Sequence, residues 1–529
     1  MNKRLSALIA GGAAVAAVIG LAPAAPAATT VATNGNAYIT ADWLAGELSS
    51  AHLLYNPNYG GFNDYGLSID AAFALNAAGG HDAAVQSIRS AIIANIAHYT
   101  TGVDYGFADE VVAGATAKAA VLEQIGGSAS SSLISQLDAR VATAAPIVGR
   151  IQDSVDPSDQ YGGDYANVFG QAFAAQALSA ASDSNTANVT DFLLKQQCSG
   201  GYFRQSFTAD KTAVNQSCVN GTDQASVDTT AQAVLSLLPR YSSPAIATAV
   251  DNAVAWLKSV QQTGGGFTDT GAAGTANTNS TGLAGYALGQ AGSTAQAAKA
   301  AAWIKALVVT PGVECASPKL LGEFGAVAKS AADLTSAKSA GITDATSDGF
   351  RRATAPALEA LTYLASPNPV TTARVSNPVY VQAGTPTTIG VGGLAAGEDN
   401  CFYDQYGGTT AANGKATIYV AGGRQVFYLD HYGPTLRTVV GALGARTFVL
   451  SLTRGTVKTP AGPQWIVRTK GLAPGEAYSV YFRGAKVSSG HASSVGAATV
   501  AFIDIGPNTA GLVTFKGQFG TRHGYFWLS

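Results

Sequence analysis

The sequence predicts a multidomain protein in which an α/α toroid of six helical hairpins, an α6/α6 barrel, is followed by all-β sandwiches. One observation behind this is an internal repeat, because the segment from Gln197 to Phe203 recurs from Gln261 to Phe267 with the same glutamine, glycine and phenylalanine positions. Repeated hairpins must stack, since one hairpin cannot bury its apolar face alone. A second observation is the change near Ser366 to alternating, strand-like sequence.

Composition narrows the class of protein. The chain has 529 residues, a length that suits two to four domains. Charged residues are only 12% and the formal net charge is −2. The sequence therefore shows no basic surface that would attract nucleic acid, and we expect no nucleic-acid binding.

The N-terminus has the order of a secretory signal peptide. Lys3 and Arg4 precede an apolar run from Leu5 to Leu21, and small residues follow up to Ala28. A membrane anchor is the alternative, but the run is rich in Gly and Ala and ends at a cleavage-like site. We expect cleavage, no later membrane span, and a secreted protein of the cell exterior or bacterial cell surface.

Four cysteines in an exported chain can pair in three ways. Cys198 and Cys218 flank one irregular loop and are expected to pair with each other. Cys315 and Cys401 would then tie the helical part to the region that follows. A zinc site is the competing interpretation, but no Cys-x-x-Cys or His-x-x-x-His spacing accompanies these residues. We expect no metal and no cofactor.

Hydrophobic periodicity and cap residues predict the helices in order. Outer helices are expected to keep charges, whereas inner helices are apolar around most of their circumference, as buried helices are. The expected outer helices cover 40–54, 82–98, 130–145, a segment ending at 195, 245–260 and 294–308. The expected inner helices cover 68–76, 109–125, 167–181, a segment from about 226, 281–291 and 348–364, with an extra helix at 320–334.

Small residues allow inner helices to approach closely, and six hairpins are the number at which such a ring closes. An open solenoid is the alternative. After the ring, the motif Gly-Leu-Ala-x-Gly-Glu occurs at 393–398 and again at 471–476, which predicts two tandem sandwiches. The predicted domains are a signal peptide at 1–28, the toroid at 29–366 and immunoglobulin-like β-sandwiches at 370–445 and 446–529.

The glutamine-aromatic repeat resembles that of squalene and hopene cyclases, and the helix start at 227–231 resembles the inner-helix start of those cyclases, of prenyltransferases and of cobalamin carriers. The likeness covers about residues 40–365 and implies the terpenoid cyclase/prenyltransferase α/α-toroid superfamily, which hosts several activities. Proton-initiated cyclases use an Asp-x-Asp-Asp run, whereas the matching position here reads Ser226-Val227-Asp228-Thr229. The prenyltransferase zinc ligands are also missing.

Acids and amides at inner-helix starts, together with aromatic turn residues, are expected to line one mouth of the ring. Capping of the first helical turn is the competing role for the acids and amides. For Asp228 we expect capping, with a pKa lowered by the helix N-terminus, and no proton donation. The candidate binding residues are Asp70, Asp109, Glu110, Asp228, Asn279, Asp348, Tyr105, Tyr161, Tyr202 and Phe267; no catalytic residue is predicted.

Three classes of function remain. The favoured one is a non-catalytic binding or surface-interaction protein that uses the polar mouth of the toroid for an unknown small molecule, glycan or surface protein. A carbohydrate-active lyase or hydrolase is the second, and it requires two carboxylates or a Tyr and His pair in one cleft. A terpenoid cyclase-like enzyme is the third, and the missing acid pair and the export signal count against it.

Overall fold

A computed structural model describes residues 34–58, 60–127, 130–159, 162–365, 368–376, 380–421, 424–443, 449–459, 462–503, 510–518 and 520–527. The predicted signal peptide at 1–28 and the candidate residue Tyr161 lie outside these ranges. No helix among the described residues has the length and apolar character needed to cross a membrane.

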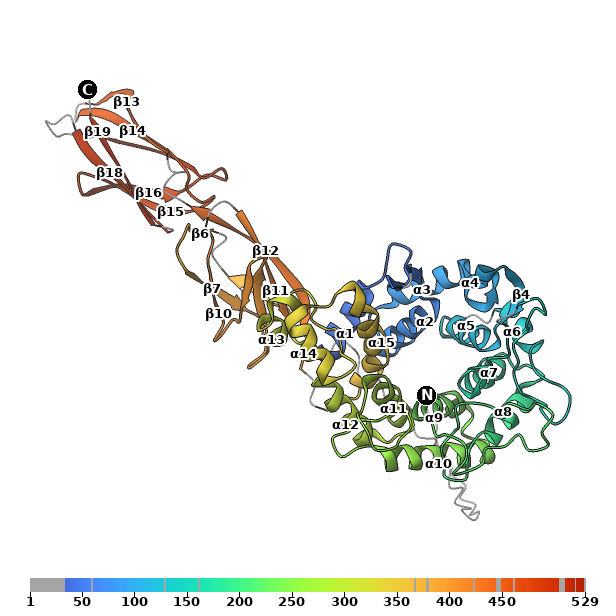
Figure 1. Ribbon diagram of the computed structural model, residues 1–529. Coiled ribbons are helices and arrows are strands. Elements are labelled where there is room, and N and C mark those ends of the chain that lie inside the picture. The colour runs from blue at the N-terminus through green and yellow to red at the C-terminus, as the bar shows by residue number, and fades with distance from the viewer. Residues whose placement is uncertain are drawn as a thin grey trace, which may run out of the picture.

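Within the described residues, six helices follow one another around a closed ring, in which each contacts the next and the last contacts the first (Figure 1). Figure 1 shows these helices facing the centre of the helical region. They are α2 (Tyr65–Ala78), α5 (Ala113–Ile125), α7 (Val168–Ala180), α9 (Val227–Leu237), α11 (Thr278–Gln290) and α15 (Asp344–Leu361).

A second set of helices packs against the outside of this ring. These outer helices are α1 (Gly35–Gly46), α3 (Asp82–Ala94), α6 (Ser131–Asp138), α8 (Thr186–Lys195), α10 (Pro244–Val260) and α12 (Thr294–Lys305). Short elements lie in the connections: β1 (Tyr55–Asn56), β2 (Phe62–Asn63), α4 (Ile96–Thr100), β3 (Thr101–Gly102), β4 (Phe107–Val111), α13 (Pro311–Cys315) and α14 (Ala331–Ala340).

Small residues allow the inner helices to pack closely. A Cβ atom added at Gly282 of α11 would lie 2.4 Å from the backbone of Pro356 in α15, and one at Gly170 would lie 3.0 Å from Gly114 Cα. Polar residues just before the helices satisfy free N–H groups of the first turn. The residues whose side chains do so are Asp64, Asn167, Ser226 and Asn277 for α2, α7, α9 and α11.

The repeated glutamine-glycine-aromatic motif joins neighbouring hairpins. Gln197 Nε2 donates to the carbonyl oxygens of Gly201 and Ala249 at 2.9 and 2.8 Å. In the second copy, Gln261 makes the same pair of hydrogen bonds, to Gly265 and Gln296. Gly201 has a φ of +97°, and a Cβ there would lie 2.6 Å from the Asn252 carbonyl oxygen, so glycine is required.

Several predicted helix boundaries are wrong. The helix expected at 40–54 is α1, which begins at Gly35 behind the Asn34 side chain and ends at Gly46. The helix expected from 109 begins at Ala113, because residues 107–111 form β4 and pair with β3. The outer helix expected at 130–145 ends at Asp138. In the insertion, α14 occupies 331–340 instead of 320–334.

The residues after the ring form two β regions, each with two sheets and its own buried core. The first contains β5 (Arg374–Ser376), β6 (Tyr380–Gln382), β7 (Thr387–Gly392), β8 (Cys401–Asp404), β9 (Gly407–Thr409), β10 (Lys415–Ile418), β11 (Arg424–His431) and β12 (Gly433–Leu443). The second contains β13 (Val449–Thr459), β14 (Gly462–Lys470), β15 (Ala477–Phe482), β16 (Ala485–His491), β17 (Ala497–Ile503), β18 (Ala510–Gly517) and β19 (Gly520–Trp527).

The two β regions share one strand order. The sheets β5-β7-β10 and β9-β8-β11-β12 of the first correspond to β13-β14-β17 and β16-β15-β18-β19 of the second, while β6 adds a parallel strand beside β12. The repeated Gly-Leu-Ala-x-Gly-Glu motif is a turn in both. Its glutamate accepts the N–H three residues earlier, at 2.5 Å for Glu398 and 2.7 Å for Glu476.

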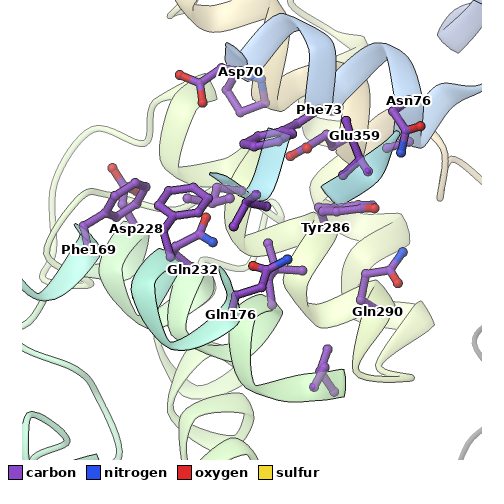
Figure 2. Close-up of a pocket in the computed structure, with 18 of the residues that line it drawn as sticks. Asp70, Phe73, Asn76, Phe169, Gln176, Asp228, Gln232, Tyr286, Gln290 and Glu359 are labelled. Carbon is purple, nitrogen blue, oxygen red and sulfur yellow. The ribbon is translucent and has the colours of Figure 1, made fainter. Parts of the chain in front are cut away.

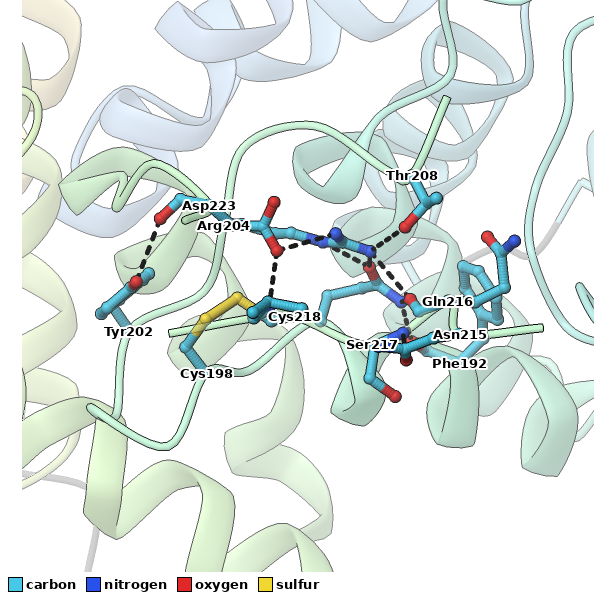
Figure 3. A network of polar contacts seen from close by, with 12 residues as sticks. Phe192, Cys198, Tyr202, Arg204, Thr208, Asn215, Gln216, Ser217, Cys218 and Asp223 are labelled. Atoms are coloured by element: carbon cyan, nitrogen blue, oxygen red, sulfur yellow. Dashed lines mark hydrogen bonds and ion pairs between the residues drawn. A yellow bond between two sulfur atoms is a disulfide. The ribbon is translucent and has the colours of Figure 1, made fainter. Parts of the chain in front are cut away.

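Both predicted disulfides are present. Cys198 pairs with Cys218, and Cys315 pairs with Cys401, which joins α13 of the helical region to β8. The loop closed by the first disulfide is also held by Arg204, whose guanidinium donates to the side chains of Gln196, Asp223 and Thr208 (Figure 3). Hydrogen bonds of Arg204 and Gln196 to the Gln216 carbonyl oxygen hold this loop next to the end of α8.

Candidate binding cavity

A cavity of about 980 Å³ lies inside the ring and is lined by one face of each inner helix. The lining residues recur every three or four positions, the spacing that places side chains on the same face of a helix. Figure 2 shows them pointing into a shared space. Examples are Asp228, Gln232 and Leu235 on α9, Asn279, Leu283, Tyr286 and Gln290 on α11, and Arg352, Pro356 and Glu359 on α15.

Much of the cavity wall is aromatic or aliphatic. The rings of Phe73 and Phe173 lie 6.0 Å apart, and Phe169 meets Phe173 edge to face at 5.6 Å. Leu235 and Leu283 line the same space. Such a wall favours an apolar ligand, because transfer of apolar surface from water to an apolar environment lowers the free energy.

Two acids of the cavity wall, Asp70 and Glu359, interact with Lys118. Lys118 Nζ lies 2.6 Å from Asp70 Oδ1 and donates to the Gly66 carbonyl at 3.0 Å. Burial raises the pKa of Glu359 to about 8, Asp70 adds to the rise and Lys118 opposes it. Glu359 is therefore mostly protonated at neutral pH and can donate a hydrogen bond into the cavity.

Asp228 lies on α9 and faces the same cavity (Figure 2). The expectation that it caps the helix with a lowered pKa is wrong, because Ser226 is the cap and its Oγ accepts the Thr229 N–H at 3.1 Å. Burial raises the pKa of Asp228, and the Ser280 hydroxyl opposes part of the rise. Among the described residues Asp228 Oδ1 has no hydrogen-bond partner.

Amide side chains form a further polar strip. Gln232 Nε2 donates to Ser236 Oγ at 3.1 Å, and that hydroxyl donates to Gln176 Oε1 at 3.2 Å. On the other side, Gln290 Nε2 donates to the Tyr363 hydroxyl at 2.8 Å. These bonds fix the amides in place, so polar groups are presented at defined points of an apolar wall.

The structure brings together three of the predicted site residues: Asp70, Asn279 and Asp228 line the cavity. Asp348 does not line it, but its carboxylate accepts from Arg352 Nε at 2.9 Å, and Arg352 does. Asp109 and Glu110 belong to β4.

The predicted aromatic residues are placed elsewhere. Tyr105 is 84% exposed in a surface turn. Tyr202 is buried against Trp256, and the centroids of the two rings lie 5.6 Å apart. Phe267 is fully buried. The aromatic residues of these last two turns therefore stabilise contacts between hairpins.

Sequence reasoning missed Glu359, Gln232 and Phe169 as lining residues. A usable signal was present, since Glu359 stands seven residues after Arg352 and Gln232 four after Asp228, which places each pair on one helix face. Among the described residues, the side chains grouped closely enough to hold a metal ion are Cys198, Cys218 and Asp223. Both cysteines are in a disulfide and offer no thiolate.

No family model and no curated protein sequence matches the chain. Among solved structures, it is similar to the type II terpene cyclase MstE from Scytonema, with 18% identity and a TM-score of 0.39 over 51% of this chain and 77% of the cyclase. It is also similar to a protein from Actinoplanes, with 18% identity and a TM-score of 0.41 over 62% of this chain and 98% of that one.

Proposed function

We propose that this protein is an exported, non-catalytic binding protein whose helical region is an α/α toroid of six hairpins, and that a largely apolar small molecule binds inside the ring. The observation that carries the proposal is the cavity of about 980 Å³ with its aromatic and aliphatic wall. Its volume lies at the upper end of the range of about 300–1,000 Å³ typical of small-molecule sites.

The polar groups of the cavity would orient such a ligand. Glu359 is mostly protonated and offers an O–H donor, while the amides of Gln176 and Gln290 are held by neighbouring hydroxyls. A ligand with a long apolar body and one hydroxyl or carbonyl group satisfies both kinds of surface. A glycan fits less well here, because most of its surface carries hydroxyls that this wall leaves unpaired.

Export is part of the proposal. It is supported by the signal-like N-terminus and by two disulfides, which persist in oxidising compartments.

Binding can be tested with the full mature chain, Nile red as an apolar fluorescent probe, and geranylgeraniol as competitor. Saturable Nile red fluorescence that geranylgeraniol displaces is expected. Leu283→Trp fills the cavity and should weaken probe binding at least tenfold. Val214→Trp is the matched control, because Val214 is 95% exposed and lies outside the cavity lining. Absence of saturable binding, or equal binding by both variants, would contradict the proposal.

A second candidate function is acid-initiated cyclisation of an alkene in the same cavity. The observation that favours it is Asp228, a carboxyl with a raised pKa and an unpartnered oxygen, in a cavity that also carries aromatic rings. Incubation with polyprenyl substrates separates the two functions. Intact substrate recovered after binding supports the binding protein, whereas cyclised product that disappears in Asp228→Asn supports the enzyme.

A further inference from the structure

A second pocket, of about 430 Å³, lies in the first β region, and its lining residues all belong to that region. Buried Phe402 and Phe427, stacked at 5.2 Å, belong to its lining. Tyr406 and Tyr419 also line it and are 80% and 56% exposed. The pocket therefore combines an apolar interior with two rings that water reaches.

Polar groups in this pocket are held in fixed positions. Asp404 Oδ1 accepts the backbone N–H groups of Tyr406 and Gly407 at 2.8 and 3.2 Å, so the turn that carries Tyr406 is set by this carboxylate. Asp404 Oδ2 accepts the amide of Gln425, which orients that amide in turn. Thr417 adds a hydroxyl to the lining.

We propose that this pocket binds a neutral sugar unit of a glycan. A pyranose ring has an apolar C–H face, which packs on an aromatic ring, and hydroxyl groups at its edge, which pair with amide, hydroxyl and carboxylate groups. The lining contributed by the described residues contains one acid, Asp404, and no lysine or arginine. An acidic sugar or a phosphate would find no counter-charge there.

The second β region supplies an internal comparison, because its strand order is the same. Asp404 and Phe482 each end the equivalent strand, β8 or β15. Tyr403 pairs with Tyr428 and Tyr481 pairs with Thr514, so Gln425 corresponds to Gly511. In the second region the Phe482 ring covers Gly511. A Cβ atom added at Gly511 would lie 2.4 Å from that ring.

Phe482 also packs on Phe502, with ring centroids 5.0 Å apart. The position that holds an oriented carboxylate and amide in the first region is therefore filled by packed aromatic side chains in the second. The position of exposed Tyr406 is taken by Gly484, the second residue after Phe482 as Tyr406 is after Asp404. The polar, aromatic-rimmed pocket is a property of the first region's residues and does not follow from the fold that both regions share.

The test is affinity electrophoresis of the full mature chain through gels that contain mannan, soluble starch, xylan or β-glucan, with alginate and heparin as acidic gels. Retardation by at least one neutral polysaccharide is expected. Tyr406→Ala and Tyr419→Ala should each weaken that retardation about tenfold or more. Tyr105→Ala is the matched control, since it removes an 84% exposed tyrosine from the helical region and should change nothing.

Retardation only in the acidic gels, no retardation in any neutral gel, or equal retardation of the wild type and both pocket variants would overturn the proposal. Nile red binding should be unchanged in Tyr406→Ala and Tyr419→Ala. The sugar proposal can therefore fail while the ring still binds an apolar ligand, and the reverse outcome is equally distinguishable.

Discussion

The cavity of the ring and the junction between the ring and the first β region both hold carboxyl groups whose pKa is raised by burial. In the cavity, Glu359 has a pKa raised to about 8 and faces a space of about 980 Å³. At the junction, Glu314 of α13 and Asp430 of β11 are both 0% exposed and lie beside the Cys315–Cys401 disulfide. Burial is the largest cause of the raised pKa in each case.

The junction pair is closed by its own hydrogen bonds. Thr435 donates to Asp430 Oδ1 at 2.6 Å, and the Gly322 N–H donates to Glu314 Oε2 at 3.2 Å. The remaining oxygens, Glu314 Oε1 and Asp430 Oδ2, accept no hydrogen bond from the described residues. A proton on one of these two carboxyl groups would let it donate to the other. We infer that Glu314 is protonated and donates to Asp430, since Asp430 raises the pKa of Glu314 further.

The difference between the two regions is access. Both use the same physical cause, desolvation, to hold a carboxyl neutral. The proton inferred on Glu314 is committed to Asp430 within the protein, whereas the proton on Glu359 faces a space that a ligand can enter. A raised pKa therefore indicates a functional site only when the group is also reachable.

The largest expected change in unfolding free energy comes from replacing a buried glutamate by leucine, once at the junction and once in the cavity. Glu314→Leu removes the donor inferred for Asp430 Oδ2 and leaves a buried carboxylate with part of its hydrogen bonds, which should lower the free energy of unfolding by about 3–5 kcal/mol. Glu359→Leu removes a group whose charged form is disfavoured by burial and should cost less than about 1 kcal/mol. Urea unfolding of the two variants measures this, and equal losses would end the comparison. Glu314→Gln, which keeps a donor, is the control for side-chain size.

A smaller effect is expected from pH. The pKa of Glu359 is raised from an ordinary value of 4.5 to about 8, so the folded state binds more protons than the unfolded state between these values. The unfolding free energy should therefore fall as pH rises from about 5 to 8 and then level off. We expect the titration of Glu359 to account for part of this fall.

Glu359→Gln isolates that part, since its amide does not titrate. The variant should show a shallower decline over the same pH range, with the difference closing below about pH 5. Nile red binding to the wild type should weaken as pH passes 8, and binding to the variant should not. Wild-type and variant profiles that run parallel would show that Glu359 does not ionise in the cavity.

Much of the ring architecture followed from local patterns in the sequence, because the Gln-Gly-aromatic repeats and the helix periods are encoded within short segments. The Cys198–Cys218 disulfide was also a local feature. The spacing from Arg352 could place Glu359 on the cavity face of its helix, but its raised pKa could not be predicted. That pKa depends on burial in the folded chain and on Asp70 and Lys118, which lie more than two hundred residues away. Tyr202 looked like a mouth residue because it follows a glycine turn, but Trp256 of the next hairpin covers it.

Helix caps were assigned to the wrong residues for a related reason. An acid near a helix start suits both a cap and a cavity wall, and the sequence does not show which way the side chain turns. For α9 the cap is Ser226, and Asp228, two residues later, points into the cavity (Figure 2).

The smallest expected effect tests this assignment on α9. Ser226→Ala removes the acceptor of the Thr229 N–H and should cost about 1 kcal/mol. Asp228→Asn keeps the shape of the side chain while removing a carboxyl whose charged form burial disfavours, so stability at pH 7 should be unchanged within about 0.5 kcal/mol or slightly higher. Chemical unfolding at pH 7 compares the two variants with the wild type. If Asp228→Asn lost about 1 kcal/mol and Ser226→Ala lost nothing, Asp228 would be the cap after all, and its carboxylate would not be available to a ligand in the cavity.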